Sequence, residues 1–315
     1  MIESVLDISQ EIMAHPKHVF LCEEQIEELA LVFAQKEKDV LTDWSFSNWE
    51  FDGKKIQAKY IILCEIIASS INYCYWYGSS KVRPLGSSST KMYDLLRAAV
   101  LQSVYDIRIY VDSSSPIMFT GPPGAPGEVV FNEPLIRNFY QLLVLHRFPM
   151  LEERYKHLYE LLNHKYIMSN IIDSILQCKN VEQTVSYLCE TFPGFASDMF
   201  LKRAQLFIMQ IQRELGIFPV SEIEKLTVPA DYQIPKILRY KGCLKYDAIL
   251  TNKIGNSEHL AKNSLEEIEI RAATIIACDK IANMSGTNAM IVDNYLWQSR
   301  KECSDNFHLT VTTDY

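Results

Sequence analysis

The sequence predicts a mainly α-helical protein that forms a single compact domain over residues 1–315. Three observations support this fold class. Apolar residues recur at helical spacing along most of the chain. Segments with the alternating pattern of strands are few. The composition, 48% hydrophobic and 22% charged, is typical of a globular protein with a sizeable core.

Helical periodicity is clear in the first half of the chain. Residues 2–14 place Val5, Ile8 and Ile12 on one face. Residues 58–76 are apolar nearly all round, which predicts a central helix that is packed on every side. The segment 89–106 begins at Ser89 and Thr90, two candidate N-caps. The other predicted helices of this half are 23–40, 132–148 and 151–166.

The second half continues this helical pattern, with short connections. Its predicted helices are 168–178, 181–192, 199–215, 232–244, 265–284 and 288–303. Two segments have β character. Residues 107–114 alternate weakly, and the β-branched residues 308–315 predict a short strand at the C-terminus.

Residues 113–134 are rich in proline and glycine and cannot be helical across "GPPGAPG". We expect an irregular loop here. A surface connector or a disordered loop is one interpretation, and a loop that borders a substrate entrance is the other.

Charge and motifs narrow the classes of function. The net charge of −8 disfavours stable binding to nucleic acid, which usually requires a basic face, and favours a small-molecule or protein partner. Motifs for dinucleotide loops, phosphate loops and hydrolase elbows are absent from the sequence. The missing motifs therefore argue against several common enzyme classes, but charge and motifs alone do not identify the function.

Cysteine usage and the N-terminus indicate a compartment. The eight cysteines occur singly, without CxxC pairs, so we expect no zinc site and mostly buried reduced thiols. The N-terminus lacks the basic and apolar regions of a secretory signal. No apolar run reaches the length of a membrane span. These features predict a cytoplasmic protein that does not bind membranes.

Asp231, in "VPADYQIPKILRY", precedes a predicted helix. An aspartate at this position is a favoured N-cap, because its carboxylate accepts the first free N–H groups of the helix. The helix end also keeps a carboxylate ionised and fixes its direction. Both properties suit a group that faces a developing cation, so the N-cap and the catalytic interpretation remain open.

Two further segments carry candidate ligand-binding groups. Asp293 lies in the apolar run "IVDNYLWQ" beside Tyr295 and Trp297, a combination suited to a purine-like ring, although the aspartate is alternatively an N-cap. Lys202 and Arg203 are consecutive on an apolar helix. One of them is predicted to face inward, where it suits a phosphate, unless both are solvated.

Glu269 and Arg271 lie in the apolar helix 265–284. Charged groups in such a helix require partners, so we expect structural ion pairs with other helices.

Taken together, blocks of the sequence resemble the queuosine salvage family, the queuosine 5′-phosphate N-glycosylase/hydrolase proteins. The blocks follow one another in the family order along nearly the whole chain. They are "INYCYW" (71–76), "LLRAAV" (95–100), "FPMLEERYKHLYELL" (148–162), "TFPGF" (191–195), "LKRAQLF" (201–207), "ADYQIPKILRYKGCLKYDAIL" (230–250), "EEIEIRAATI" (266–275) and "VDNYLW" (292–297).

The resemblance implies a helical fold related to DNA glycosylases and release of queuine from queuosine 5′-monophosphate, for reuse in tRNA modification. It implies that Asp231 is the catalytic carboxylate, that Asp293 contacts the base, and that Lys202 lies near the phosphate. We expect further substrate contacts from the residues around them, which are Pro229, Tyr232, Tyr295, Trp297 and Gln298. The chemistry requires no metal or cofactor.

This chain departs from the family pattern at three of the positions near the expected site. Family members usually carry an aromatic residue at position 229, Arg at 233 and Asp at 298, where this chain has Pro229, Gln233 and Gln298. These changes motivate one alternative, a weakened relative that binds a nucleotide or protein without catalysis. A glycosylase that acts on nucleic acid is a separate alternative, which the net charge disfavours. The sequence makes no prediction of the oligomeric state.

Overall fold

The computed structural model describes residues 2–35, 50–51, 54–55, 57–76, 88–105 and 132–315, and helices make up most of them. The predicted mainly α-helical class is confirmed. The weak strand at 107–114 and nearly all of the loop 113–134 lie outside the described residues.

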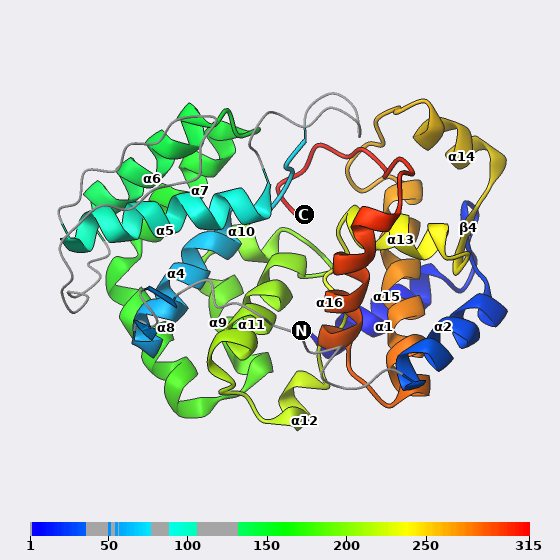
Figure 1. Cartoon of the computed structure of the whole chain (residues 1–315), viewed down its shortest axis with the longest axis horizontal. Coiled ribbons are helices and arrows are strands. Elements are labelled where there is room, and N and C mark those ends of the chain that lie inside the picture. The colour runs from blue at the N-terminus through cyan, green and yellow to red at the C-terminus, as the bar shows by residue number, and fades with distance from the viewer. Residues whose placement is uncertain (1, 36–49, 52–53, 56, 77–87, 106–131) are drawn as a thin grey trace.

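The helices form two groups that lie side by side (Figure 1). One group comes from the middle of the chain. It consists of α4 (Ala58–Ser70), α5 (Ser89–Tyr105), α6 (Glu133–Leu145), α7 (Leu151–Asn163), α8 (Lys165–Cys178), α9 (Val181–Thr191), α10 (Pro193–Ala196), α11 (Lys202–Leu215) and α12 (Val220–Ile223).

The other group joins helices from the two ends of the sequence. It consists of α1 (Glu3–Ile12), α2 (Glu23–Gln35), α13 (Gln233–Tyr240), α14 (Ala248–Gly255), α15 (Leu265–Ser285) and α16 (Ala289–Ser299), which a 3₁₀ turn at Arg300–Glu302 follows. The helix α15 contacts α1, α2, α13 and α16, so it is the axis of this group.

Two short antiparallel pairs are the strands of the described structure. β1 (Val19–Leu21) pairs with β4 (Leu244–Tyr246), with Phe20 opposite Lys245. β2 (Glu50–Phe51) pairs with β3 (Lys54–Lys55). The first pair joins segments more than 200 residues apart and closes the N-terminal helices onto the C-terminal ones.

The side chain of Glu269 holds this closure in place. Its two carboxylate oxygens accept N–H groups from Lys17, His18 and Val19, at 2.7–3.0 Å. Glu269 therefore bonds to backbone, and the prediction that it forms an ion pair is wrong, because the start of β1 supplies its donors. The ion pair predicted for Arg271 is confirmed with Asp198.

The predicted helix 58–76 ends at Ser70, and residues 71–76 continue as a buried irregular segment. Periodicity did not reveal this end because 71–76 are as apolar as the helix. The carbonyl groups of the segment have cationic partners in place of helical ones. Arg154 of α7 donates to the carbonyls of Ile71, Tyr73 and Cys74.

The C-terminal residues 308–315 do not form the predicted strand. They make one isolated bridge, between Leu309 and His259, and pass through the fold with His308 and Tyr315 buried. Thr310 and Thr312 are buried and Val311 is exposed, and no strand edge in the described part of the chain extends along the segment. A smaller correction concerns α5, where Ser88, one residue before the predicted caps, accepts the N–H of Lys91.

The buried apolar side chains form one cluster, which includes residues of both helix groups from Ile2 to Tyr315. The cysteines are free thiols, all buried except Cys178. Among the described residues, no helix has the length and apolar character to cross a membrane. The single-domain boundary over 1–315 remains a prediction.

Candidate active site

Asp231 lies at the start of α13 and is partly accessible. Its Oδ1 accepts the N–H groups of Gln233, at 2.7 Å, and Ile234, at 3.1 Å. The carboxylate thus caps the helix, as the N-cap interpretation predicted. Both bonds use the same oxygen, and no described residue donates to Oδ2. The cap therefore fixes the carboxylate and leaves one oxygen for another partner.

Asp293 lies within α16, which Asn288 caps by accepting the N–H of Ile291. The N-cap interpretation of Asp293 is therefore wrong. The pKa of this carboxyl is raised to about 8, chiefly by burial and also by the charge of Asp231, while the charge of Lys202 acts in the opposite direction. The residue is nevertheless partly accessible.

Lys202 is the first residue of α11, and its side chain is 4% exposed. Its Nζ donates to the carbonyl of Asn72, at 2.9 Å, and to the Asn72 side-chain oxygen, at 3.4 Å. Burial lowers its pKa to about 8, while Asp231 and Asp293 act in the opposite direction. Two carboxylates and one ammonium from three separate elements therefore form one electrostatic group.

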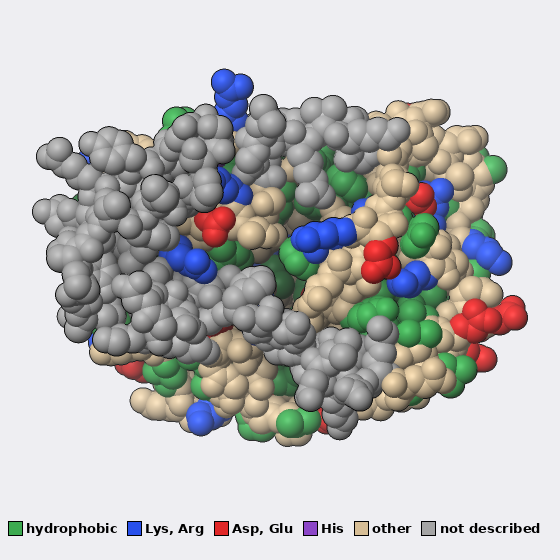
Figure 2. All heavy atoms as spheres, viewed as in Figure 1, with side chains coloured by type: hydrophobic (Ala, Val, Ile, Leu, Met, Phe, Trp, Pro, Cys, Tyr) green, Lys and Arg blue, Asp and Glu red, His purple; other side chains and the backbone are tan. Residues whose placement is uncertain are grey.

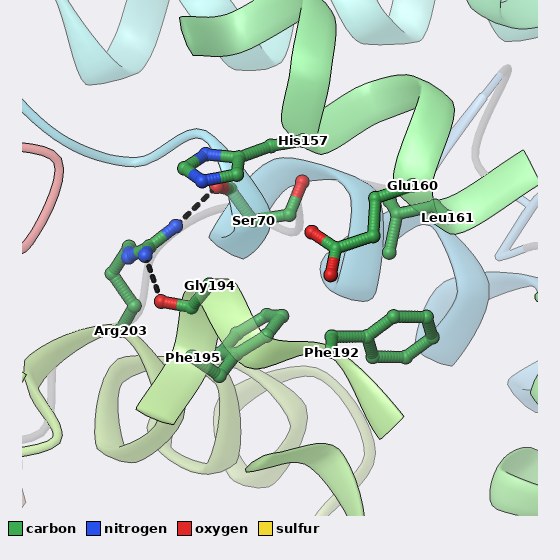
Figure 3. A pocket seen from close by; sticks show the side chains of 8 residues that line it. All are labelled: Ser70, His157, Glu160, Leu161, Phe192, Gly194, Phe195 and Arg203. Atoms are coloured by element: carbon green, nitrogen blue, oxygen red, sulfur yellow. Dashed lines mark hydrogen bonds between the residues drawn. The ribbon is translucent and has the colours of Figure 1, made fainter. Parts of the chain in front are cut away.

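The neighbour of Lys202 is also buried, so the prediction of a solvated pair is wrong. Arg203 is 2% exposed and donates to the carbonyls of Ser70 and Gly194. It faces a small hollow beside the start of α11, which His157 and Glu160 of α7 also line (Figure 3). This hollow leaves no room for a bound molecule, and it lies on the Arg203 side of the helix.

The predicted aromatic contacts are distributed around the carboxylates. Tyr232 is buried, with its ring 4.6 Å from that of Phe307. Tyr295 meets Phe33 of α2 edge-on, at 4.8 Å between ring centroids. Trp297 is partly accessible, and the guanidinium of Arg300 covers one of its faces. The ring also packs against the hydrophobic core, so a stacking contact with a substrate base remains a prediction.

The positions that depart from the family pattern differ in exposure. Pro229 is buried next to the Asp231 turn. Gln233 is 4% exposed, and its Oε1 has no partner among the described residues. Gln298 is exposed and donates to Asn294 on its own helix. The structure thus places Gln233 inside and Gln298 at the surface, and a substrate contact by Gln298 remains a prediction.

The face of the molecule in Figure 2 is hollowed near its centre, beside α16. The helix that carries Asp293 therefore adjoins a recess in the surface. Within the described part of the chain, no three His, Cys, Asp or Glu side chains gather in a way that suits a metal ion.

Sequence reasoning missed Asn72 and Asp198, and it predicted an ion pair for Arg271 without connecting that residue to this group. Asn72 accepts a hydrogen bond from the ammonium of Lys202, and Asp198 accepts one from the backbone N–H of the same lysine. Arg271 binds Asp198 and the carbonyl of Ala230, directly before Asp231. The blocks "INYCYW" and "EEIEIRAATI" contain two of the three, but periodicity assigns these blocks to the core.

Comparison with known proteins gives a family match. The family model described as "Queuosine salvage protein" matches residues 50–313. A protein of Schizosaccharomyces pombe named queuosine 5′-phosphate N-glycosylase/hydrolase is 28% identical over 213 residues, which cover 61% of this chain and 60% of that protein. The protein of the same name from Sphaerobacter thermophilus is 24% identical, over 92% of this chain and 88% of its own.

The match to the mouse protein of that name covers 53% of its length, so the chain aligns with less than two thirds of two of these relatives. Among solved structures, the chain aligns with an 8-oxoguanine DNA glycosylase from Pyrobaculum aerophilum complexed with 8-oxoguanosine. The TM-score is 0.41, at 12% identity over 89% of both chains. That score is too low to establish a shared fold.

Proposed function

This chain belongs to the queuosine salvage protein family, and from that premise we propose that it hydrolyses the N-glycosidic bond of queuosine 5′-monophosphate or a similar nucleoside or nucleotide. Water adds to C1′ of the sugar as the bond to the base nitrogen breaks, and the base leaves with a proton. The product is queuine or a related 7-deazaguanine base, available for tRNA modification.

Asp231 is the proposed catalytic carboxylate. Cleavage of an N-glycosidic bond builds positive charge on C1′ and O4′ of the sugar, and a fixed carboxylate stabilises that charge or attacks C1′. The cap bonds hold Oδ1 in place. The Oδ2 atom is the one that we assign to the sugar, since it receives no bond from the described residues.

Asp293 is the proposed contact to the base. A guanine-type edge presents two N–H donors that fit one carboxylate. With a pKa near 8, the carboxyl is largely protonated at neutral pH in the empty protein. Two donors favour its ionised form, so we expect binding of the base to release a proton.

Lys202 is the proposed contact to the 5′-phosphate. Its ammonium makes two bonds to Asn72 and has a third N–H to donate. Burial lowers its pKa to about 8, and a phosphate beside it favours the charged form again. The substrate would thereby supply the negative charge that this buried cation lacks.

One observation carries the proposal. Asp231, Asp293 and Lys202 come from three elements distant in the sequence, and the charge of Asp231 acts on the pKa values of both Asp293 and Lys202, which also act on each other. Functional sites are where such perturbed groups gather. We also propose that the protein acts in the cytoplasm on a small molecule, which agrees with its net charge of −8.

The test is release of queuine from queuosine 5′-monophosphate by the purified protein, followed by mass spectrometry. Asp231→Asn keeps the capping oxygen and removes the charge, so we expect kcat to fall at least about 100-fold while the melting temperature stays close to that of the wild type.

Asp247→Asn is the matched control. Asp247 also caps a helix, by accepting the N–H of Leu250, and it lies in another part of the fold. We expect this variant to keep full turnover. A wild-type protein that is stabilised by the nucleotide but forms no product would instead support the alternative of a binding protein without catalysis.

A further inference from the structure

Arg271 of α15 makes bonds to both halves of the proposed site through a single guanidinium. Its two Nη atoms donate to Asp198 at 2.8 and 2.7 Å. Its Nε donates to the carbonyl of Ala230 at 3.0 Å. Ala230 directly precedes Asp231, so this last bond holds the peptide from which the carboxylate projects.

The Asp198 bonds lead to Lys202. The same two carboxylate oxygens that bind Arg271 accept the N–H groups of Phe200, at 3.1 Å, and Lys202, at 2.9 Å. These bonds fix the turn that begins α11. Within that turn, Leu201 has a φ of 52°, in the left-handed region that non-glycine residues rarely adopt. Such a conformation persists only where its surroundings strongly constrain it.

The guanidinium has little freedom to move. It is 2% exposed, and its carbon lies 4.6 Å from the ring centroid of Phe200 and 4.4 Å from that of Tyr315. Ring packing and three directed hydrogen bonds fix the plane of the group. The rigid guanidinium therefore holds the Ala230 carbonyl and the Asp198 carboxylate at a fixed distance from each other.

We propose that Arg271 is a positioning residue, which sets the Asp231 turn against the Lys202 turn and thereby the distance between the reacting sugar and the phosphate. This inference rests on the proposed function for its catalytic consequence, although its structural part is independent of it. Arg271 itself touches no substrate. It acts through Ala230 on one side and Asp198 on the other.

The variant Arg271→Lys tests this role. Lysine keeps the positive charge near Asp198, but its single ammonium cannot donate to Asp198 and to the Ala230 carbonyl in the same fork. We expect kcat for queuosine 5′-monophosphate to fall about 10- to 100-fold, with KM changed less than about threefold, because misplacement of a reacting group acts on the transition state.

Glu269→Gln is the matched control. Glu269 lies on the same helix, is 1% exposed and makes three hydrogen bonds to backbone, but its partners are in residues 17–19. We expect a comparable fall in melting temperature and unchanged kcat. Equal loss of kcat in both variants would overturn the positioning role and leave a purely structural one.

Amide hydrogen exchange supplies a measurement that does not depend on activity. The N–H groups of Gln233 and Ile234 are bound by Asp231. In Arg271→Lys we expect them to exchange at least about tenfold faster than in the Glu269→Gln protein. Unchanged exchange at these amides overturns the proposal. If the wild-type protein releases no base, the proposed function fails, and the exchange comparison still decides whether Arg271 holds the turn.

Discussion

Asp198 and Asp293 are both central carboxylates in this fold, but their partners differ. Asp198 accepts four hydrogen bonds, two from backbone N–H groups and two from Arg271. Although burial alone would raise its pKa, the charge and bonds of Arg271 bring the pKa below its usual value. Asp293 receives no hydrogen bond from the described residues, and burial raises its pKa to about 8.

The difference separates stabilisation from binding. A buried carboxylate with every lone pair occupied supports the fold and has nothing left to offer a ligand. A carboxylate that lacks partners destabilises the empty protein in its ionised form, and this cost is removed when a ligand supplies donors. We therefore expect the free energy of unfolding to respond differently to mutation at the two aspartates, and to depend on pH with opposite sign.

The largest expected effect is on stability, at Asp198. Asp198→Ala removes the two-bond carboxylate partner of the buried Arg271 guanidinium, leaves it only the longer ion pair with Glu267 at 3.6 Å, and removes the acceptors of two N–H groups. We expect the free energy of unfolding to fall by about 3–5 kcal/mol, measured by urea denaturation. Asp293→Asn should not lower it at pH 7 and should raise it, because the neutral amide does not carry the cost of a buried carboxyl whose folded pKa is raised. Equal losses would remove the distinction between the two aspartates.

A second prediction concerns the pH dependence of stability. Because the folded pKa of Asp293 lies near 8 and its ordinary value is 3.8, the folded state binds one more proton than the unfolded state between these values. The contribution of Asp293 to the free energy of unfolding therefore falls as pH rises through this window, by up to about 1.4 kcal/mol per pH unit.

Asp293→Asn should remove this slope. We expect the unfolding free energy of the variant, relative to the wild type, to increase between pH 5 and pH 8 in denaturant titrations. The contribution of Asp198 has the opposite sign, since it is complete above the ordinary pKa and is lost only as pH falls below it. If the free energy of unfolding of the variant stayed parallel to that of the wild type between pH 5 and pH 8, the raised pKa of Asp293 would be refuted.

The smallest expected effect is at Gln298, on the same helix as Asp293. Its side chain is exposed and bonded to Asn294. We expect Gln298→Ala to change the free energy of unfolding by less than about 0.5 kcal/mol and KM by less than about twofold. A rise in KM beyond about tenfold would show that the side chain turns toward the substrate, as the family resemblance predicts.

The sequence predicted the longer helices because their apolar periodicity is local information. It missed the short helices α10, α12 and α14 and the strands β1 and β4, which are too short to show a clear period. The family blocks in the sequence also led us to assign Asp231, Asp293 and Lys202 to one predicted site. Sequence prediction failed where tertiary partners decide the conformation. Residues 71–76 leave the helix because Arg154 and Lys202 bind their carbonyls.

The same limit applies to the polar network. A charged residue on an apolar helix requires a partner, but periodicity does not say which one. Glu269 and Arg271 are two residues apart, and one binds the backbone of β1 while the other binds Asp198. Only the folded arrangement distinguishes them, so the role of Arg271 was not predictable from its position in the helix.

The pairing of β1 with β4, and the packing of α1 and α2 on α15, have a consequence for biosynthesis. The ribosome makes residues 3–35 long before their partners in residues 244–285. Until then, the apolar faces of α1 and α2 have no place to pack. We expect the nascent chain to need chaperone protection until residues 244–285 have emerged, and the packing of α1 and α2 on α15 to form only then.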